Sequence, residues 1–318
     1  MKAKVELLKV CAGLLAGGLF TAGSAYADAY AVAVDNVKNG FISATAGVTF
    51  QNVVSGSTTS ATLNGAFAAG QAPPGMNPDS PISALGSAAA RANETVNGDG
   101  YYILIGSNGS SYSWGDANVV QEQTATATIT ARNAAETNIS GNGYGTADGT
   151  NKSSTQLTVA VGAAGGTISF AFDADPFIQA TLDAGANSGS VARAGTGFSI
   201  SLTNVSTGAI VFNWTPDGSL GAGIVGGTES SDAENLNVTL AAFAGQDLTH
   251  SGPYAVGTYG HYAAVSNALA AGTYTMSISM DEKTDVQRIS LVPEPETYAL
   301  MFAGLAVVGF MARRRRGD

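Results

Sequence analysis

Two carboxylates spaced two residues apart are the first feature of this chain that could do chemistry. The segment Phe172-Asp173-Ala174-Asp175-Pro176 reads as the end of a strand. In an extended chain Asp173 and Asp175 point to the same face, where they could hold a calcium ion. They could also serve as the acid and base of a secreted hydrolase, although nothing in the sequence fixes the separation of the two acids. Acids at strand ends are also often simply solvated, and the chain has no D-x-D-x-D-G loop.

Three tyrosines close together in the sequence form a second candidate site. Tyr254, Tyr259 and Tyr262 lie in a Gly- and Tyr-rich stretch, beside His261. Aromatic rings next to acids and amides are typical of carbohydrate sites, so these tyrosines are candidate glycan-binding residues. Trp114, with Tyr112 and Asp116, has a similar composition. The alternative for both groups is that the rings belong to the core or to turns.

Signatures of catalysis are otherwise missing from the sequence. His250 and His261 are the only histidines, and both fall in a stretch that we expect to be an exposed loop. No H-x-x-x-H spacing supports a zinc site, and no G-x-S-x-G elbow supports hydrolase chemistry. We therefore expect a protein that is not an enzyme and has no cofactor, apart from the calcium ion considered above.

Short segments in which apolar and polar residues alternate would form the strands that position these residues. Segments such as 29–34, 41–54, 124–131, 155–161, 167–172, 198–202, 209–214, 236–243, 273–280 and 286–291 recur about every ten residues and are separated by Gly, Asn and Asp turns. Lys38-Asn39-Gly40 and Asp148-Gly149 read as two of these turns, and Ser206-Thr207-Gly208 as a hairpin. The pattern predicts an all-β body of the β-sandwich or jelly-roll type. A short helix is plausible at 82–92, and 71–118 is the best candidate for an insertion or a domain boundary.

The composition of the body restricts its partners. Between Asp28 and Val292 there are seven Lys and Arg against twenty Asp and Glu, a net charge near −13. Such an acidic body argues against nucleic acid and against anionic lipid surfaces as partners. The single cysteine, Cys11, lies in the N-terminal segment, so we expect a body without disulfides whose stability comes from core burial.

The N-terminal segment reads as a secretory signal. Lys2, Lys4 and Lys9 form a basic start, residues 10–20 form an apolar run, and Ala25-Tyr26-Ala27 is an A-x-A cleavage site. We therefore expect residues 1–27 to be a signal peptide recognised by the Sec export machinery. The mature chain would then begin at Asp28.

The C-terminal segment combines a rigid elbow, an apolar run and a block of cations. Pro293-Glu294-Pro295 ends any preceding structure, Tyr298 to Ala312 is apolar throughout, and Arg313, Arg314, Arg315 and Arg316 follow. A helix of this apolar run would span about 22 Å, which is short of the roughly 30 Å hydrocarbon core. Arginines that reach back to the headgroups and local thinning of the bilayer relieve this mismatch. The arginines predict a membrane stop that stays cytoplasmic, with the body outside.

This order of elements resembles the PEP-CTERM sorting signal of Gram-negative bacteria. In that family an integral-membrane exosortase recognises and removes the tail, and the body goes to the cell surface or the extracellular matrix. The resemblance implies that Pro293, Glu294 and Pro295 are the recognition motif, while Glu296 and Tyr298 depart from residues common in the family. Segments 171–184, 208–218 and 270–287 also resemble one group of exosortase-dependent surface proteins that has no assigned activity.

These observations lead to one expected organisation and function. Residues 1–27 would be the signal peptide, 28–291 the secreted β-sandwich body, and 292–318 a sorting and anchor segment. The partners would be the exosortase, the inner membrane transiently and exopolysaccharide, with no nucleic acid. We expect a non-catalytic exported surface or matrix protein, with a carbohydrate-binding module as the alternative and a secreted hydrolase as a less favoured one.

Overall fold

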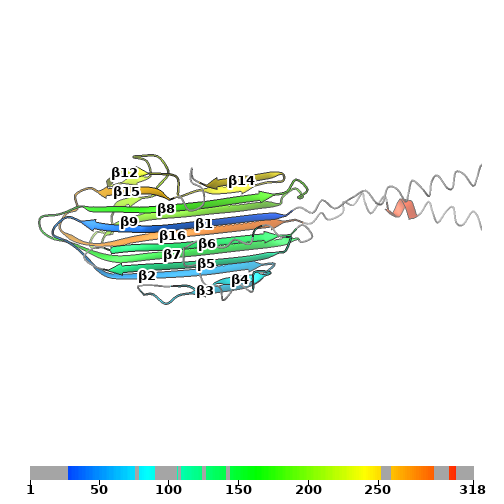
Figure 1. Ribbon diagram of the computed structural model, residues 1–318, viewed down its shortest axis with the longest axis horizontal. Helices are drawn as coiled ribbons and strands as arrows, with labels where there is room; N and C mark the ends of the chain where they lie inside the picture. The colour runs from blue at the N-terminus through cyan, green and yellow to red at the C-terminus, as the bar shows by residue number, and fades with distance from the viewer. Residues whose placement is uncertain are drawn as a thin grey trace, which may run out of the picture.

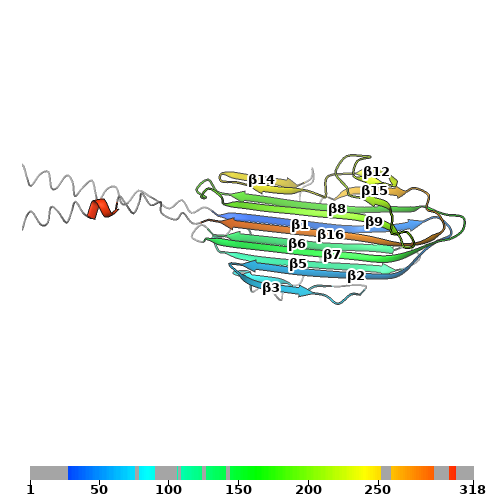
Figure 2. The ribbon, with the colours of Figure 1, turned by 180° about the vertical axis from the view of Figure 1, so that it is seen from behind.

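Two antiparallel sheets packed face to face make up the body. The computed structural model describes residues 28–75, 79–89, 106, 109–123, 127–140, 144–251, 259–289 and 301–305. Its strands run along the long axis of an elongated sandwich (Figures 1 and 2). The prediction of an all-β sandwich is therefore confirmed. The expected signal helix lies outside the described residues, as does the expected membrane helix apart from 301–305, which are helical.

Each sheet has eight strands. The first sheet contains β1 (Ala29–Ala44), β4 (Ser83–Gly86), β5 (Tyr112–Gln123), β6 (Ala127–Ile139), β8 (Ile168–Leu182), β12 (Gly227–Asp232), β14 (Gln246–Ser251) and β15 (Gly260–Ser266). The second contains β2 (Val48–Leu63), β3 (Ala66–Gln71), β7 (Gly145–Val161), β9 (Val191–Asn204), β10 (Ile210–Trp214), β11 (Ile224–Val225), β13 (Thr239–Ala242) and β16 (Gly272–Arg288). The central order is β8-β1-β6-β5 in the first sheet and β9-β16-β7-β2 in the second, and β1 contacts β16 across the interior.

Several predicted breaks lie inside long strands. Lys38-Asn39-Gly40 is part of β1, where the pairing register shifts and Asn39 adopts φ 53°. A β-bulge of this kind uses the same Asn and Gly chemistry as a turn, so the sequence alone does not separate the two. Asp148-Gly149 lies inside β7, and the predicted strands 273–280 and 286–291 are replaced by one strand, β16. The helix considered at 82–92 is also wrong in its described part, because β4 occupies residues Ser83–Gly86.

The interior divides into two apolar cores along the strands. The distal core is rich in large side chains, among them Phe170, Phe172, Phe198, Phe212 and Trp214. The tail-end core, near the start of β1 and the end of β16, consists largely of alanines with a few larger residues such as Ile139 and Leu182. Alternating burial along β7 and β9 produces both cores, as a two-residue period requires. A third cluster, with Tyr30, Tyr112 and Trp114, lies on the outer face of the first sheet.

A polar belt separates the two cores. It consists of buried polar side chains that point between the sheets: Asp35, Asn133, Asn151, Ser153, Thr196, Glu282 and Thr284. Asp35 follows Ala33 of the tail-end core and precedes Val37 of the distal core, and Glu282 has the same position on β16. Ser153 Oγ donates to Asn133 Oδ1 at 3.0 Å, which joins the two sheets across the belt. The sandwich is thus held by apolar packing at both ends and by polar contacts in the middle.

Candidate functional site

The two predicted carboxylates lie in the middle of a strand and not at its end. Asp173 and Asp175 belong to β8, which continues to Leu182. β15 pairs with residues 169–174 of β8 and β14 with residues 177–182, so Asp175 and Pro176 fall in the gap between these neighbours. A proline suits this position, because among the described residues no strand pairs with β8 there on that side.

Asp173 is the centre of a polar network on the outer face of the first sheet. Its Oδ1 is 2.8 Å from His261 Nδ1, and its Oδ2 accepts a hydrogen bond from Asn39 Nδ2 at 2.7 Å. Lys38 Nζ lies 3.3 Å from the centre of the Tyr259 ring, in a cation–π contact. Burial alone would raise the pKa of Asp173, but the hydrogen bonds from Asn39 and His261 and the charges of His261 and Lys38 hold that pKa below its ordinary value. We call these five residues, Lys38, Asn39, Asp173, Tyr259 and His261, the outer-face network.

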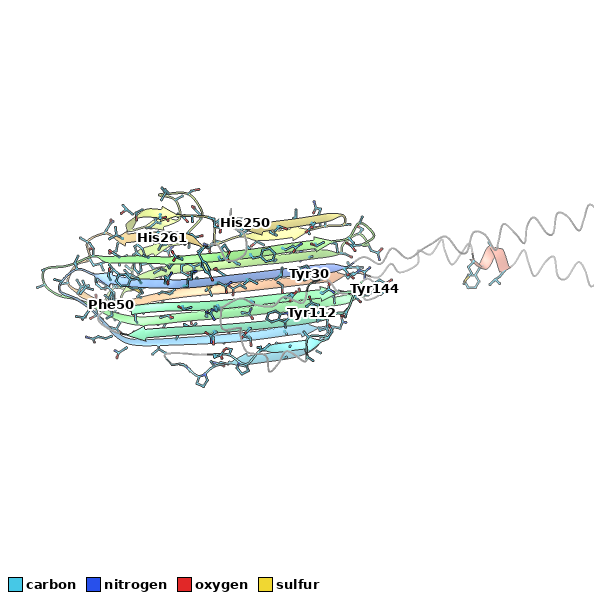
Figure 3. All side chains as sticks on the ribbon, in the orientation of Figure 1. Tyr30, Phe50, Tyr112, Tyr144, His250 and His261 are labelled. Carbon is cyan, nitrogen blue, oxygen red and sulfur yellow. The ribbon has the colours of Figure 1, made fainter. Side chains whose placement is uncertain are left out.

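The elements around this network explain how it forms. The bulge in β1 brings Lys38 and Asn39 to β8, where Lys38 pairs with Asp173. His261 lies opposite Asp173 on the other side of β8, because β15 pairs there. The histidines were expected in a loop, but His250 is in β14 and His261 is in β15 (Figure 3). The backbone pairing of short strands therefore fixes both rings.

The second acid, Asp175, has a different environment from Asp173. It is only 7% exposed, and its charge raises the pKa values of Asp35 and Glu234. Among the residues that the structure describes, no group of three His, Cys, Asp or Glu side chains is arranged to hold a metal ion. The calcium prediction at Asp173 and Asp175 stays a prediction, and the structure gives Asp173 two other polar partners.

The two candidate tyrosines that the structure describes, Tyr259 and Tyr262, lie on opposite faces of the first sheet. Tyr262 is fully buried in the distal core and stacks on Phe172, with ring centroids 4.9 Å apart and planes at 7°. Its ring therefore cannot be part of an exposed glycan-binding face, which corrects that residue's predicted role. The two-residue alternation of β15 explains the outcome, because Tyr262 and His261 are adjacent and must point to opposite faces. Tyr259 is in the outer-face network, and Tyr254 lies outside the described residues.

The aromatic group around Trp114 is also buried, although it lies on the outer face of the first sheet. Tyr112 and Trp114 are buried, and both donate hydrogen bonds to the Glu136 carboxylate, at 3.0 and 2.6 Å. Tyr30 Oη donates to the same carboxylate at 2.9 Å, and the backbone N–H of Gly106 donates at 2.7 Å. Glu136 is thus a fully buried acid whose charge four donors satisfy, and it holds residue 106 against the sheet.

The polar belt contains acids without such donors. Asp35 and Glu282 are both fully buried, and within the described residues only the nearby backbone N–H of Asn36 and the side chain of Asn133 favour their charged forms, without forming well-aligned hydrogen bonds. Burial raises the pKa of Asp35 to about 8, with further contributions from Asp175 and Glu234. Burial and the proximity of Asp35 raise the pKa of Glu282 well above its ordinary value. Burial therefore favours the protonated form of both acids in the folded chain.

Glu234 lies between this belt and the surface. Burial raises the pKa of Glu234 to about 7, and the charge of Asp175 adds to the effect. One carboxylate oxygen is 3.8 Å from Nε2 of the partly exposed His250. Neither Glu234 nor the belt was predicted from the sequence. A signal for the belt was present, however, because Asp35 interrupts an alternating apolar run at a core position.

A cavity of about 40 Å³ lies between the sheets in the distal core. Phe170, Phe172 and Phe198 are among its lining residues, and polar atoms contribute little to its surface. A small cavity with so few exposed polar atoms does not suit a polar ligand. The cavity is therefore not a candidate site for a sugar.

The two described ends of the body lie together at one end of the sandwich. Ala29 pairs with Ile139, and Arg288 pairs with Gly145, six residues further along the chain. The backbone N–H of Asp28 donates to Asp183 Oδ2 at 2.8 Å, and Asn187 Nδ2 donates to the carbonyl of Ile289 at 2.8 Å. Arg288 Nη1 also donates to the carbonyl of Ser140 at 2.5 Å. The segment that follows residue 289 therefore leaves from a firmly anchored strand.

Comparison with known families identifies that segment. The family model described as the PEP-CTERM protein-sorting motif matches residues 291–316. The chain carries a PEP-CTERM sorting signal. No curated protein and no solved structure matches the chain.

The PEP-CTERM sorting signal sets the destination of the chain. It implies export, anchoring in the membrane during sorting, and an exosortase as the processing partner. Its Pro293, Glu294 and Pro295 lie outside the described residues, as do Arg313 to Arg316 and the predicted cleavage residues Ala25 and Ala27. In the part of the chain that the structure describes, no helix is both long and apolar enough to cross a membrane.

Proposed function

We propose that this chain is a non-catalytic surface or extracellular-matrix protein that an exosortase sorts and processes, and that it associates with exopolysaccharide. The observation that carries the proposal is the PEP-CTERM sorting signal, which begins two residues after Ile289, the last described residue of the β-sandwich. A stable β body without disulfides suits an exported scaffold. The buried acids of the polar belt and the hydrogen-bonded Glu136 are interior groups of the fold. Much of the polar chemistry inside the body therefore needs no catalytic role.

Alanine replacement of Pro293, Glu294 and Pro295 together tests the sorting step. We expect the precursor to keep its tail and to stay in the membrane fraction, because the recognition elbow is gone. The measurement is the mass and the location of the body in cells that produce the full chain. Thr297→Ala, which leaves the elbow intact, is the control. Normal release of the triple variant at the cell surface would contradict the sorting role.

Carbohydrate binding through the outer-face network is a second candidate function. The specific observation is that an acid, an amide, an imidazole, an ammonium group and a phenol ring meet on one accessible face. Such a set can donate and accept hydrogen bonds with sugar hydroxyls. His261 is well exposed, with 59% of its side-chain surface accessible, so a ligand could reach it.

A glycan array with and without chelator tests this candidate. We expect Asp173→Ala and His261→Ala to reduce binding to any glycan that the unsubstituted chain retains by at least about tenfold, since each removes a central polar group. Asp247→Ala is the matched control, because Asp247 lies on β14 on the same outer face and bonds only with Gln179 and Thr181 in the described contacts. Absence of binding in both conditions would reject the candidate, and loss with chelator alone would indicate calcium.

A further inference from the structure

The last strand of the body, β16, has a neighbouring strand on each side, and the residue that follows it is hydrogen-bonded to the body. β16 pairs with β7 along Gly272–Arg288 and with β9 along Tyr274–Gln287. After it, the backbone N–H of Ile289 donates to Ser190 Oγ at 3.1 Å, and its carbonyl accepts from Asn187. Residue 289 is thus fixed to the sandwich by its own backbone groups and cannot be drawn away without opening the end of the sheet.

The sorting signal starts almost at once after this fixed point. The matched segment begins at residue 291, and Pro293 is four residues after Ile289. Four residues reach at most about 14 Å even when fully extended. A domain of only 100 residues already has a radius of gyration of about 13 Å. A protease that binds the chain at Pro293 therefore cannot avoid the end of the folded body.

The end of the body presents a defined surface to such a protease. Tyr144 is 56% exposed and Ile289 is 38% exposed, and the Tyr144 ring lies 5.9 Å from the Arg288 guanidinium. Figure 3 shows Tyr144 at the end of the sandwich from which the chain leaves. Asp183, also exposed, lies at the same end, where it binds the backbone of Asp28. We call Tyr144, Asp183, Arg288 and Ile289 the tail-end face.

We propose that the tail-end face is a docking surface for the membrane protease that removes the tail. This inference rests on the proposed exosortase processing and adds a second point of recognition, on the folded body. The occupant is a protein and not an anionic lipid surface, because the body carries a net charge near −13 and the face includes Asp183. An apolar and aromatic patch with an acid at its rim suits a protein partner.

Processing rates at two tail spacings test the proposal. The double variant Tyr144→Ser, Ile289→Ser is compared with the unsubstituted chain, each with and without a twenty-residue Gly/Ser linker inserted after Ile289. Such a linker adds a mean reach of about 25 Å, which separates the face from the cleavage point. The readout is the rate at which precursor loses its tail in a pulse-chase experiment on the full chain.

At the native spacing we expect the double variant to be processed at least threefold more slowly than the unsubstituted chain. When both chains carry the linker, we expect equal rates. Val205→Ser is the control, since Val205 is 58% exposed at the opposite end of β9. Equal rates at the native spacing would overturn the proposal. Equal slowing in both backgrounds would also overturn it, because it would indicate a folding defect, which limited proteolysis of the precursor would detect. If the unsubstituted chain also keeps its tail, the proposed exosortase processing is wrong, and the docking proposal is rejected with it.

Discussion

Replacing Asp35 by asparagine should make the folded chain more stable, and the gain should be much larger at pH 8 than at pH 5. Asp35 is fully buried between the sheets, where its carboxylate oxygens form no well-aligned hydrogen bond among the described residues. Its pKa is raised to about 8, first by burial and then by Asp175 and Glu234. Asparagine has nearly the same shape as the protonated acid and cannot ionise.

The sign of the effect follows from proton binding. The folded state holds the proton of Asp35 up to about pH 8, whereas the unfolded chain releases it near pH 4. Stability from this group is therefore complete below pH 4 and is lost as the pH rises toward 8. At about 1.4 kcal/mol per pH unit, the loss between pH 5 and pH 8 is roughly 4 kcal/mol. Glu282 acts in the same direction, because its pKa is raised by the same burial.

Urea unfolding at pH 5, 6, 7 and 8 measures the effect. The free energy of unfolding of the unsubstituted chain should fall across this series, and that of Asp35→Asn should fall less steeply. Asp247→Asn is the control, because hydrogen bonds from Gln179 and Thr181 lower the pKa of Asp247 and place its titration below this range. A stability curve of the unsubstituted chain that rises from pH 5 to pH 8 would contradict the protonated state of the belt.

Replacing Glu136 by alanine should destabilise the body by at least about 3 kcal/mol. The change removes the buried acceptor of the Tyr30 hydroxyl and of the Trp114 indole N–H, whereas the Tyr112 hydroxyl can still donate to the Gly106 carbonyl at 2.8 Å. Each such group costs about 1–3 kcal/mol when it is left unpaired away from water. The cavity left by the lost side chain adds to this cost.

Thermal unfolding and tryptophan fluorescence together measure this result. Glu136→Gln is the graded comparison, because glutamine keeps one acceptor oxygen and nearly the same volume, so its loss should be clearly smaller. A shift of the Trp114 emission to longer wavelength before global unfolding would show that the outer-face cluster opens first. An alanine variant as stable as the unsubstituted chain would mean that the four donors find other partners.

The sequence predicted the class of fold well because alternation is a local property. Runs such as Thr155 to Val161 and the hairpin around Ser206-Thr207-Gly208 appear in the structure near their predicted places. The boundaries were less predictable, because a bulge at Asn39 and a turn use the same residues. Only the register between β1 and β8 shows that Lys38-Asn39-Gly40 lies inside a strand.

The candidate site depended on contacts that no local pattern encodes. Asp173 and His261 are 88 residues apart in the chain and meet only because β15 pairs with β8. The burial of Tyr262 could have been predicted from alternation once the strand was known, since its neighbour His261 faces outward. The acids of the belt could be suspected from the position of Asp35, but their mutual proximity requires the pairing of two whole sheets.

The central position of β16 has a consequence for export. In its sheet, β16 lies between β7 and β9, which pair with it and not with each other, so the sheet has an open seam until residue 288 has crossed the membrane. Unpaired strand edges of that length invite pairing with other chains. The second sheet of the exported chain therefore cannot be completed before its last strand, β16, is available. Because the PEP-CTERM sorting signal begins only three residues after Arg288, the segment that anchors the chain during sorting follows the strand that closes this seam.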